Sequence, residues 1–404
     1  IKLKVGKGLS LKSILLLLIA LPTFLSAQQK INLEKAIEIA LENNRGIVAS
    51  EAAYEYSQEM IGNGFDLEKT EIYYMFDEAN IAPNNEALDV IGINQSFRFP
   101  TIYSSRRKML KAKSTLSLED YRLEKRKLSL EVSKAYYEIV YEQDKLKHYV
   151  YLDSLYSEFE SASEKKYKKG ESNYLESLMA RSKRKEVEIE MNQIRESLNK
   201  AYIQFNSKLQ ADTIYLVEED SLKELVYIGL DTIDHPQLQY YDQAAQVAER
   251  EFKLAKQHLW PDLNVSVFRG SNNAGGQEVF SGFQLGVAIP LWFGPQKSKI
   301  DAARSSNSMM RAKAEDIRIR LLAQSMSLQS DLKKYREELD YYRKNGKQLA
   351  IELETQAIKA YRSGEISYLE YIQSLESSRT ITLNYLLSLF QYNITVLEAN
   401  YLIN

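Results

Sequence analysis

Two closely similar ten-residue segments lie about half a chain apart, and they limit the possible folds more than any other feature. Residues 167–176 read Tyr-Lys-Lys-Gly-Glu-Ser-Asn-Tyr-Leu-Glu, and residues 361–370 read Tyr-Arg-Ser-Gly-Glu-Ile-Ser-Tyr-Leu-Glu. The segments are 194 positions apart in a chain of 404 residues. We therefore predict two tandem copies of one unit, spanning residues 28–207 and 234–404, with residues 208–233 as an irregular connector.

Each segment joins two long helical patterns. Glycine just past a helix commonly takes the left-handed conformation that ends it, so Gly170 and Gly364 predict two hairpin turns. Asn173 and Ser367 can then cap the helices that follow. Residues 101–169 contain neither proline nor glycine. A helix of that length would extend roughly 100 Å at about 1.5 Å per residue, and it must pack in a coiled coil or bundle. Further helices are expected over 31–61 with a break at 43–46, and over 173–207, 236–258, 297–360 (weakest at Gly346) and from 367 to the C-terminus.

The hydrophobic period changes to two just before each of the longest helices. Apolar residues alternate there with small or polar ones, which predicts strands of about ten residues in hairpins at about 70–99 and 262–289. This length and this alternation are typical of outer-membrane strands, whose apolar face meets lipid. The residues expected on the lipid-facing side are Ile91, Ile93, Phe97, Phe283, Leu285 and Val287.

The strands allow two interpretations, either a membrane sheet or an amphipathic sheet that helices cover in a soluble protein. Aromatic residues near the strand ends predict an interfacial girdle and favour the membrane. They are Tyr73, Tyr74, Tyr103, Trp260, Trp292 and Phe293. Four strands cannot close a barrel, and lipid does not tolerate an open sheet edge. Several chains would therefore share one barrel, and both a dimer and a trimer reach the minimum of about eight strands.

The first 27 residues have the pattern of a signal peptide. Lysines precede the apolar run Ile14–Leu21, and Ala27 is a plausible cleavage point, so we expect export. The chain has no cysteine, which excludes disulfides, thiol-based sites and a lipid-bearing N-terminal cysteine. Its 53 basic and 55 acidic residues nearly balance, and nothing indicates nucleic-acid binding.

The sequence contains no convincing catalytic or cofactor-binding constellation. The three histidines, at 148, 235 and 258, are far apart in sequence and suit packing or surface positions. The pair Met309-Met310 invites a soft-metal interpretation, but adjacent positions on a helix point in different directions, so packing is favoured. We therefore expect no enzyme activity, no cofactor and no bound metal.

Taken together, these features resemble the TolC-type outer-membrane efflux proteins, or outer-membrane factors. The matching residues are the opening Ile31–Asn44, the strand exits Phe99-Pro100 and Ile289–Gly294, and the twin glycine turns. The resemblance implies a mainly α chain with a small β part. It also implies a homotrimer that shares a twelve-stranded outer-membrane barrel and a long helical coiled-coil tunnel. The expected role is a passive exit duct for an efflux or type I secretion system of a Gram-negative bacterium.

The resemblance also assigns partners and candidate sites. The glycine turns would lie at the periplasmic end, where a periplasmic adaptor and an inner-membrane pump of RND or ABC type dock. The docking candidates are Tyr167, Lys169, Gly170, Glu171, Tyr361, Arg362, Gly364 and Glu365. By position, Glu370 and Gln373 match a ring of acids that narrows the tunnel mouth in the family. Glu370 also fits a capping box with Ser367, as Glu176 does with Asn173.

Two questions stay open at this level. The lysines at 165, 166, 168 and 169 could contact the adaptor or simply stabilise a helix C-terminus. An exported coiled-coil scaffold or adhesion protein without a pore is the alternative function.

Overall fold

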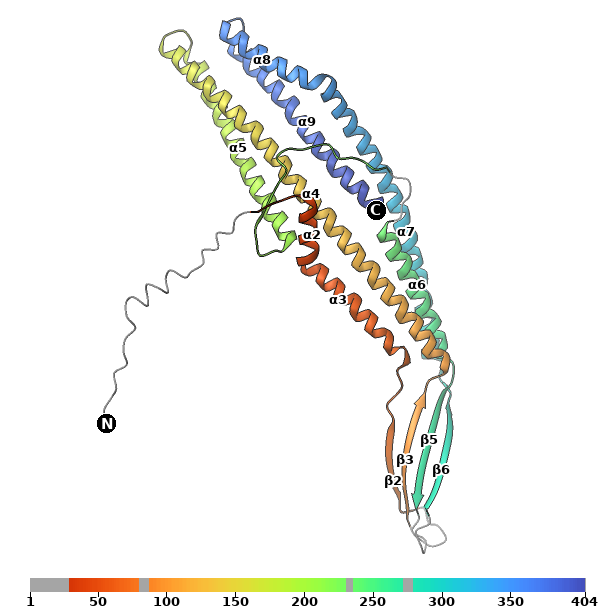
Figure 1. The fold of residues 1–404 in the computed structure, drawn as a ribbon. Helices are drawn as coiled ribbons and strands as arrows, with labels where there is room; N and C mark the ends of the chain where they lie inside the picture. Colours follow the sequence, from red (N-terminus) through yellow and green to blue (C-terminus); the bar gives the residue numbers. More distant parts are fainter. Residues whose placement is uncertain (1–28, 80–86, 230–234, 272–278, 404) are drawn as a thin grey trace, which may run out of the picture.

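The protein is an elongated molecule with helices along most of its length and a small sheet at one end (Figure 1). The computed structural model describes residues 29–79, 87–229, 235–271 and 279–403. The predicted signal peptide lies outside these residues. None of the described helices is both long and apolar enough to cross a membrane.

The elements follow each other in the same order in the two halves of the chain. Before the connector they are β1 (Gln29–Ile31), α2 (Leu33–Asn43), α3 (Arg45–Glu59), the 3-10 helix η1 (Met60–Phe65), β2 (Glu71–Asp77), β3 (Leu88–Phe97), α4 (Pro100–Lys168) and α5 (Tyr174–Leu209). After it come α6 (Pro236–Gln257), β5 (Asp262–Ser271), β6 (Val279–Ala288), α7 (Phe293–Tyr341), α8 (Lys347–Ser363) and α9 (Tyr368–Ile403). A hairpin of strands followed by a hairpin of long helices thus occurs twice.

The helix boundaries near the N-terminus follow from side-chain caps. Asn32 accepts a hydrogen bond from the Lys35 backbone N–H at 2.9 Å, which starts α2. Asn44 ends α2 and caps α3 by accepting from the Gly46 N–H at 2.9 Å, so the predicted break is confirmed. The α-helix ends at Glu59, two residues before the expected residue 61, and the 3-10 helix η1 follows it to Phe65.

Gly64 has a packing role within η1. A Cβ atom at this position would lie 2.7 Å from the Arg107 Cβ and 2.9 Å from its Cα, too close for any side chain. The missing side chain therefore lets η1 lie directly on α4, just where the helices meet the sheet.

The four longer strands form one antiparallel sheet in the order β2-β3-β5-β6. Ile93 lies opposite Ile72 on β2 and Val267 on β5, so the side-chain alternation of the strands is in phase across the sheet. β3 ends at Phe97, two residues before the predicted end of the hairpin at about residue 99. It ends early because the Arg98 N–H bonds to the Tyr103 hydroxyl at 2.9 Å, which removes it from the strand ladder. In the second strand pair, β5 extends to Ser271.

The connector contains more structure than the sequence predicted. Its strand β4 (Tyr215–Val217) pairs in parallel with β1. Farther along, the fully buried Asn393 of α9 accepts from the Leu225 N–H at 2.9 Å and donates to the Lys223 carbonyl at 2.8 Å. These bonds hold the connector across the long helices.

The helices bury two apolar clusters. The larger joins α2, the middle of α4, the end of α5 and the end of α9, and includes Tyr136, Phe205, Leu209, Tyr392 and Leu402. The smaller lies toward the glycine turns and includes Leu152, Tyr156, Phe159, Tyr361, Tyr371 and Leu375. Gly346, the expected weak spot, ends a π-helical segment (Tyr342–Gly346) between α7 and α8, where Tyr342 stacks on Tyr385 at 3.8 Å.

Candidate functional site

The four-stranded sheet lies beyond the end of the described helices, which leave its faces uncovered (Figure 1). One of the two faces carries exposed apolar side chains. Phe283 is 74% exposed and Leu285 is 71% exposed, although both belong to a regular strand. This apolar face comprises Ile72, Tyr74, Phe76, Ile91, Ile93, Val267, Phe283, Leu285 and Val287. An isolated soluble protein would rarely expose so large an apolar patch.

The opposite face of the sheet, here called the polar face, carries polar side chains that hydrogen-bond to one another between strands. Ser96 donates to Asn264 at 2.5 Å, and Asn94 donates to Glu71 at 3.2 Å. Tyr73 also lies on this face, within hydrogen-bonding distance of Ser266 (3.4 Å), and its ring covers Gly92. The expected place of Tyr73 in a lipid-side girdle is therefore wrong, because its register partner Gly92 leaves the space that its ring fills.

Both outer strands of the sheet, β2 and β6, have an unpaired edge. Each carries apolar side chains on the same face as the inner strands, for example Ile72 on β2 and Leu285 on β6. The sheet in one chain is thus open, two-faced and able to extend on both sides.

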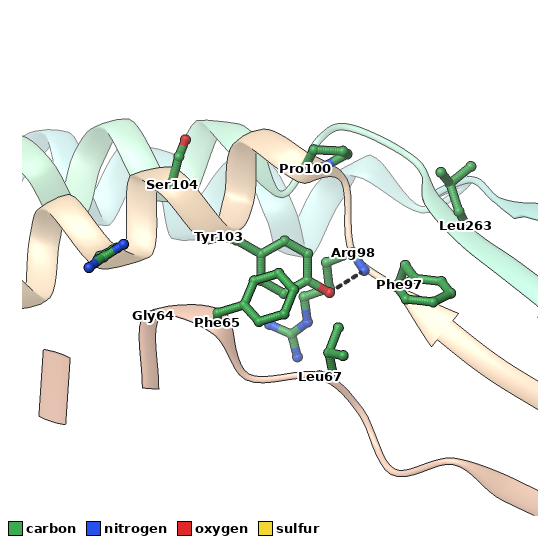
Figure 2. A pocket seen from close by; sticks show the side chains of 10 residues that line it. Gly64, Phe65, Leu67, Phe97, Arg98, Pro100, Tyr103, Ser104 and Leu263 are labelled. Carbon is green, nitrogen blue, oxygen red and sulfur yellow. Dashed lines mark hydrogen bonds between the residues drawn. The ribbon is translucent and has the colours of Figure 1, made fainter. Parts of the chain in front are cut away.

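The junction between sheet and helices, here called the collar, is formed by residues 60–70, 97–107, 258–263 and 288–294. Trp292 is 85% exposed, and Trp260 and Phe293 are also exposed, as an interfacial girdle requires. Tyr103 is half-buried and its hydroxyl bonds inside the collar. Phe97, expected on the lipid-facing side, lies on that face of β3 but is half-buried in a collar pocket (Figure 2).

The two glycine turns lie at the far end of the helices from the sheet (Figure 1). Gly170 and Gly364 have φ of 77° and 78°, the left-handed conformation that was predicted. In each turn the glycine N–H bonds to the carbonyl three residues back, at 2.9 and 3.2 Å. The next N–H bonds five residues back at 2.9 Å. This is the Schellman arrangement, so the repeated sequence forms the same turn twice.

Most of the residues predicted at the turns are exposed. Those available to a partner are Tyr167, Lys169, Gly170, Glu171, Arg362, Gly364 and Glu365. Tyr361 differs from its counterpart Tyr167, because it is only 9% exposed and packs against Phe159 and Tyr371. Its side chain therefore stabilises the molecule internally and offers little surface to a partner.

Three contacts join the α4–α5 turn to the α8–α9 turn. The Tyr361 hydroxyl donates a hydrogen bond to Glu176, and Lys166 lies 4.6 Å from the centre of the Tyr361 ring. Arg362 pairs with Glu158 at 2.7 Å. Burial, followed by the bond to Glu176, raises the pKa of Tyr361 well above its usual value, so it stays a donor.

The lysine run before the first turn is divided between internal contacts and solvent. Lys166 covers the Tyr361 ring, and Lys168 pairs with Glu164 at 2.6 Å within α4. Lys169 is exposed at the helix end, where it is still available either to a partner or to the helix C-terminus.

The two predicted capping boxes differ. In the second turn, the Ser367 N–H donates to the Glu370 carboxylate at 2.8 Å, and the Glu370 N–H donates back to the Ser367 hydroxyl at 3.3 Å. In the first turn only half forms, with Asn173 accepting from the Glu176 N–H at 2.9 Å. The Glu176 carboxylate instead accepts from Ser172 and Tyr361, so the prediction of two equal boxes is wrong.

The two candidate gate residues are exposed on the first turns of α9. The bonds from the Ser367 N–H and hydroxyl lower the pKa of Glu370, which is therefore ionised near neutral pH. Gln373 lies three residues farther along and is also exposed. The capping role of Glu370 is thus present, and it leaves one carboxylate oxygen without a bond to Ser367.

A charge network that sequence reasoning missed lies behind the turns, between α5 and α9. Glu376 accepts from Lys183 at 2.8 Å and from Arg379 at 3.3 Å, and Arg379 also pairs with Glu190 at 3.2 Å. Tyr156 of α4 donates to Glu376 at 3.2 Å. The signal was hidden because these residues are far apart in sequence and look like ordinary solvated charges.

His235, one of the three histidines, has a structural role. His235 is 1% exposed and caps α6 by accepting from the Gln237 N–H at 3.1 Å. Its ring packs on Tyr401 at 4.9 Å. Within the described parts of the chain, no group of three or more histidine, cysteine, aspartate or glutamate residues is placed to hold a metal ion.

Solved structures match the chain in three dimensions although they share little sequence. A membrane protein from Pseudomonas aeruginosa matches with a TM-score of 0.79 at 14% identity, over 93% of this chain and 90% of that one. CusC matches with a TM-score of 0.78 at 14% identity, over 94% of both chains. The CusC structures concern conformational changes that accompany folding and transmembrane channel formation. The outer membrane protein VceC from Vibrio cholerae matches with a TM-score of 0.75 at 14% identity, over 92% of this chain and 96% of VceC. Neither a family model nor a curated protein matches the sequence.

These matches confirm the predicted fold. The chain has the mainly helical TolC-type fold of outer-membrane efflux channels, with a small sheet at one end and long helical hairpins at the other.

Proposed function

We propose that this chain forms the outer-membrane exit duct of an efflux or type I secretion system in a Gram-negative bacterium. It assembles as a homotrimer and conducts cargo passively across the periplasm and the outer membrane. The duct itself does no chemistry and needs no cofactor.

One observation carries the proposal: an open, four-stranded sheet with an exposed apolar face and a polar face. In lipid, every backbone N–H and C=O must find a partner inside the protein, so the free edges of β2 and β6 cannot stay open. Pairing β6 of one copy with β2 of the next closes the sheet into a barrel. The apolar face then meets lipid and the polar face lines a water-filled lumen.

The number of copies follows from the fold. Three chains of four strands give a twelve-stranded barrel, and the helices of the same three chains continue it as a tunnel. Two chains would give only eight strands, a size at which side chains fill the interior. Three copies therefore suit a conducting duct better.

The glycine turns are the proposed docking end. They are the part of the chain farthest from the sheet, and they present an exposed turn with the same backbone twice (Figure 1). A periplasmic adaptor would meet Lys169, Glu171, Arg362 and Glu365, and an inner-membrane pump of RND or ABC type would deliver cargo there. Tyr361 would act behind this surface by holding the two turns together.

Glu370 and Gln373 are the proposed gate. Near the threefold axis of a trimer, three ionised Glu370 carboxylates would attract cations at the tunnel mouth. Capping occupies part of each carboxylate but does not neutralise it, so the two roles are compatible.

Membrane extraction and conductance test the duct. The mature protein should require detergent for extraction, run as a trimer in native mass spectrometry and form channels in planar bilayers. The alternative, a coiled-coil scaffold or adhesion protein without a pore, requires a protein that extracts without detergent and conducts no ions. Native mass spectra showing only monomers with protected strands would overturn the shared barrel.

The division into repeats 28–207 and 234–404 with connector 208–233, and the signal peptide at 1–27, stay predictions. N-terminal sequencing of the protein recovered from membranes checks the cleavage point after Ala27.

A further inference from the structure

A pocket of about 600 Å³ lies in the collar on the side of the apolar face. Its apolar wall consists of Phe65, Leu67, Phe97, Tyr103 and Leu263. Figure 2 shows these side chains around one hollow, with the Phe65 and Tyr103 rings side by side at 5.0 Å. Phe97 and Leu263 are register partners on the apolar face of the sheet, so the pocket adjoins that face.

The pocket is built from fixed parts. The Arg98 N–H donates to the Tyr103 hydroxyl at 2.9 Å, which holds the Tyr103 ring in the wall. Close packing of Gly64 on Arg107 fixes η1, and with it the neighbouring Phe65. The hollow therefore results from the way in which η1, the end of β3 and the start of α4 meet.

Two arginines, Arg98 and Arg107, are among the residues that line the pocket. From Arg98 to Leu118 the chain carries six basic residues and no acidic one. Three of them are paired: Arg98 with Glu68 at 3.4 Å, Arg106 with Asp66 at 3.5 Å and Lys113 with Glu251 at 2.7 Å. Arg107 lines the pocket and is exposed, and no described residue forms an ion pair with it.

We propose that this pocket binds a phospholipid, with an acyl chain against the apolar wall and the headgroup phosphate on Arg107. The inference rests on the proposed function, which places the collar at the periplasmic surface of the outer membrane. A phospholipid fits because it joins an apolar chain to an anionic group, as the site joins an apolar hollow to an unpaired guanidinium. Arginine recognises phosphate through two parallel N–H donors, which gives the headgroup a defined position. Three such sites would surround each trimer.

Native mass spectrometry of the delipidated trimer, titrated with dioleoylphosphatidylglycerol, tests the inference. We expect saturable binding of three lipids per trimer. Arg107→Ala should weaken it about tenfold, as the loss of one charge-assisted contact predicts. Arg181→Ala, at an exposed arginine near the glycine turns, is the matched control and should leave binding unchanged.

One further variant and two fragments of the lipid separate the contribution of the acyl chains from that of the headgroup. Leu67→Asn should weaken binding of the whole lipid, because it places an amide in the apolar wall. Diolein, which lacks the phosphate, should bind equally weakly to the wild type and to Arg107→Ala. Glycerophosphate, which lacks the chains, should not displace the lipid at equal concentration.

Several results would overturn the inference. Equal lipid binding by Arg107→Ala and the wild type would remove the phosphate contact. Full displacement by glycerophosphate would make the site a simple anion site. Trimers that conduct ions but bind no lipid would contradict the lipid site alone, whereas absence of trimers would contradict the proposed function as well.

Discussion

The hydroxyl of Tyr361 donates a hydrogen bond to the carboxylate of Glu176, across 185 positions of sequence. The two residues belong to the two glycine turns, yet they do not occupy equivalent positions in them. Tyr361 is buried, whereas Tyr167 at the same place in the first turn is exposed. The tyrosines at matching positions of two similar segments thus have different surroundings: one side chain is buried and the other faces solvent.

Removing this hydroxyl should loosen the two turns. Tyr361→Phe keeps the packing on Phe159 and Tyr371 but leaves Glu176 with Ser172 as its side-chain donor. We expect a loss of about 1 kcal/mol in local stability, a typical net value for one hydrogen bond. Amide exchange over residues 166–176 and 361–370 should become about fivefold faster, as this energy implies. Tyr167→Phe is the control, and equal protection in the two variants would contradict the coupling.

Arginine substitutions should distinguish the two faces of the sheet. Leu285→Arg should reduce assembly in the outer membrane by about 2–4 kcal/mol, the cost near the midplane, and Val287→Arg should cost less because Val287 lies beside the collar. Gln284→Arg, on the polar face next to Leu285, should assemble normally. The fraction of trimer recovered from membranes measures this. Tolerance at residue 285 with failure at 284 would mean that the lumen and lipid faces are exchanged.

The turn glycines should resist substitution because of their backbone conformation. No neighbouring atom lies within 4 Å of a Cβ built at Gly170 or Gly364, so crowding is not the reason. Alanine at either site should cost about 1–2 kcal/mol, the penalty of a left-handed L-residue. The cost should appear as faster amide exchange in the turn. Gly62→Ala, also uncrowded but without a positive φ, should show no such change.

Stability should fall in mild acid because of His235. Burial, followed by the nearby Arg126, lowers the pKa of His235 to about 4, while the unfolded value is about 6.5. The unfolded chain therefore binds a proton first, and stability is lost as the pH falls from about 6.5 to about 4. The loss is at most about 3 kcal/mol for this group.

His235→Asn isolates this effect, because asparagine can still cap α6 but does not titrate. Thermal unfolding between pH 4 and 7 should depend less on pH in the variant. Part of the dependence should remain, since burial also lowers the pKa values of His148 and His258. A variant with the same pH dependence as the wild type would exclude His235 as the cause.

The gate hypothesis for Glu370 predicts a change in cation block. Glu370→Gln can still form the capping box but carries no charge. Three carboxylates at a narrow mouth focus a strong field, so their loss should weaken block of single channels by multivalent cations.

Glu176→Gln is the control for that experiment. Its amide oxygen can still accept from Tyr361, and no gate acid is expected in the first turn, so block should stay as in the wild type. Equal block in all three proteins would leave Glu370 with only its capping role.

Much of the fold could be predicted because its signals are local. The glycine turns follow from the backbone freedom of Gly170 and Gly364, and the faces of the sheet follow from alternation along single strands. Both depend only on near neighbours in sequence, and the structure confirms both. The helix α4 was predicted to within one residue at each end for the same reason.

The tertiary structure alone decided which distant residues meet. The bond from Tyr361 to Glu176, the network around Glu376 and the collar pocket all combine residues from separate segments. Arg98 shows the reason most directly. The alternation of apolar and polar residues continues past Phe97 in the sequence, but β3 ends there. The reason is that the Arg98 backbone N–H donates to the Tyr103 hydroxyl, and the Tyr103 ring is held in place by packing on Phe65. Local periodicity in the sequence thus determined the helices, the strands and their faces. Competition for hydrogen-bond partners between distant segments determined where these elements end and which residues they contact.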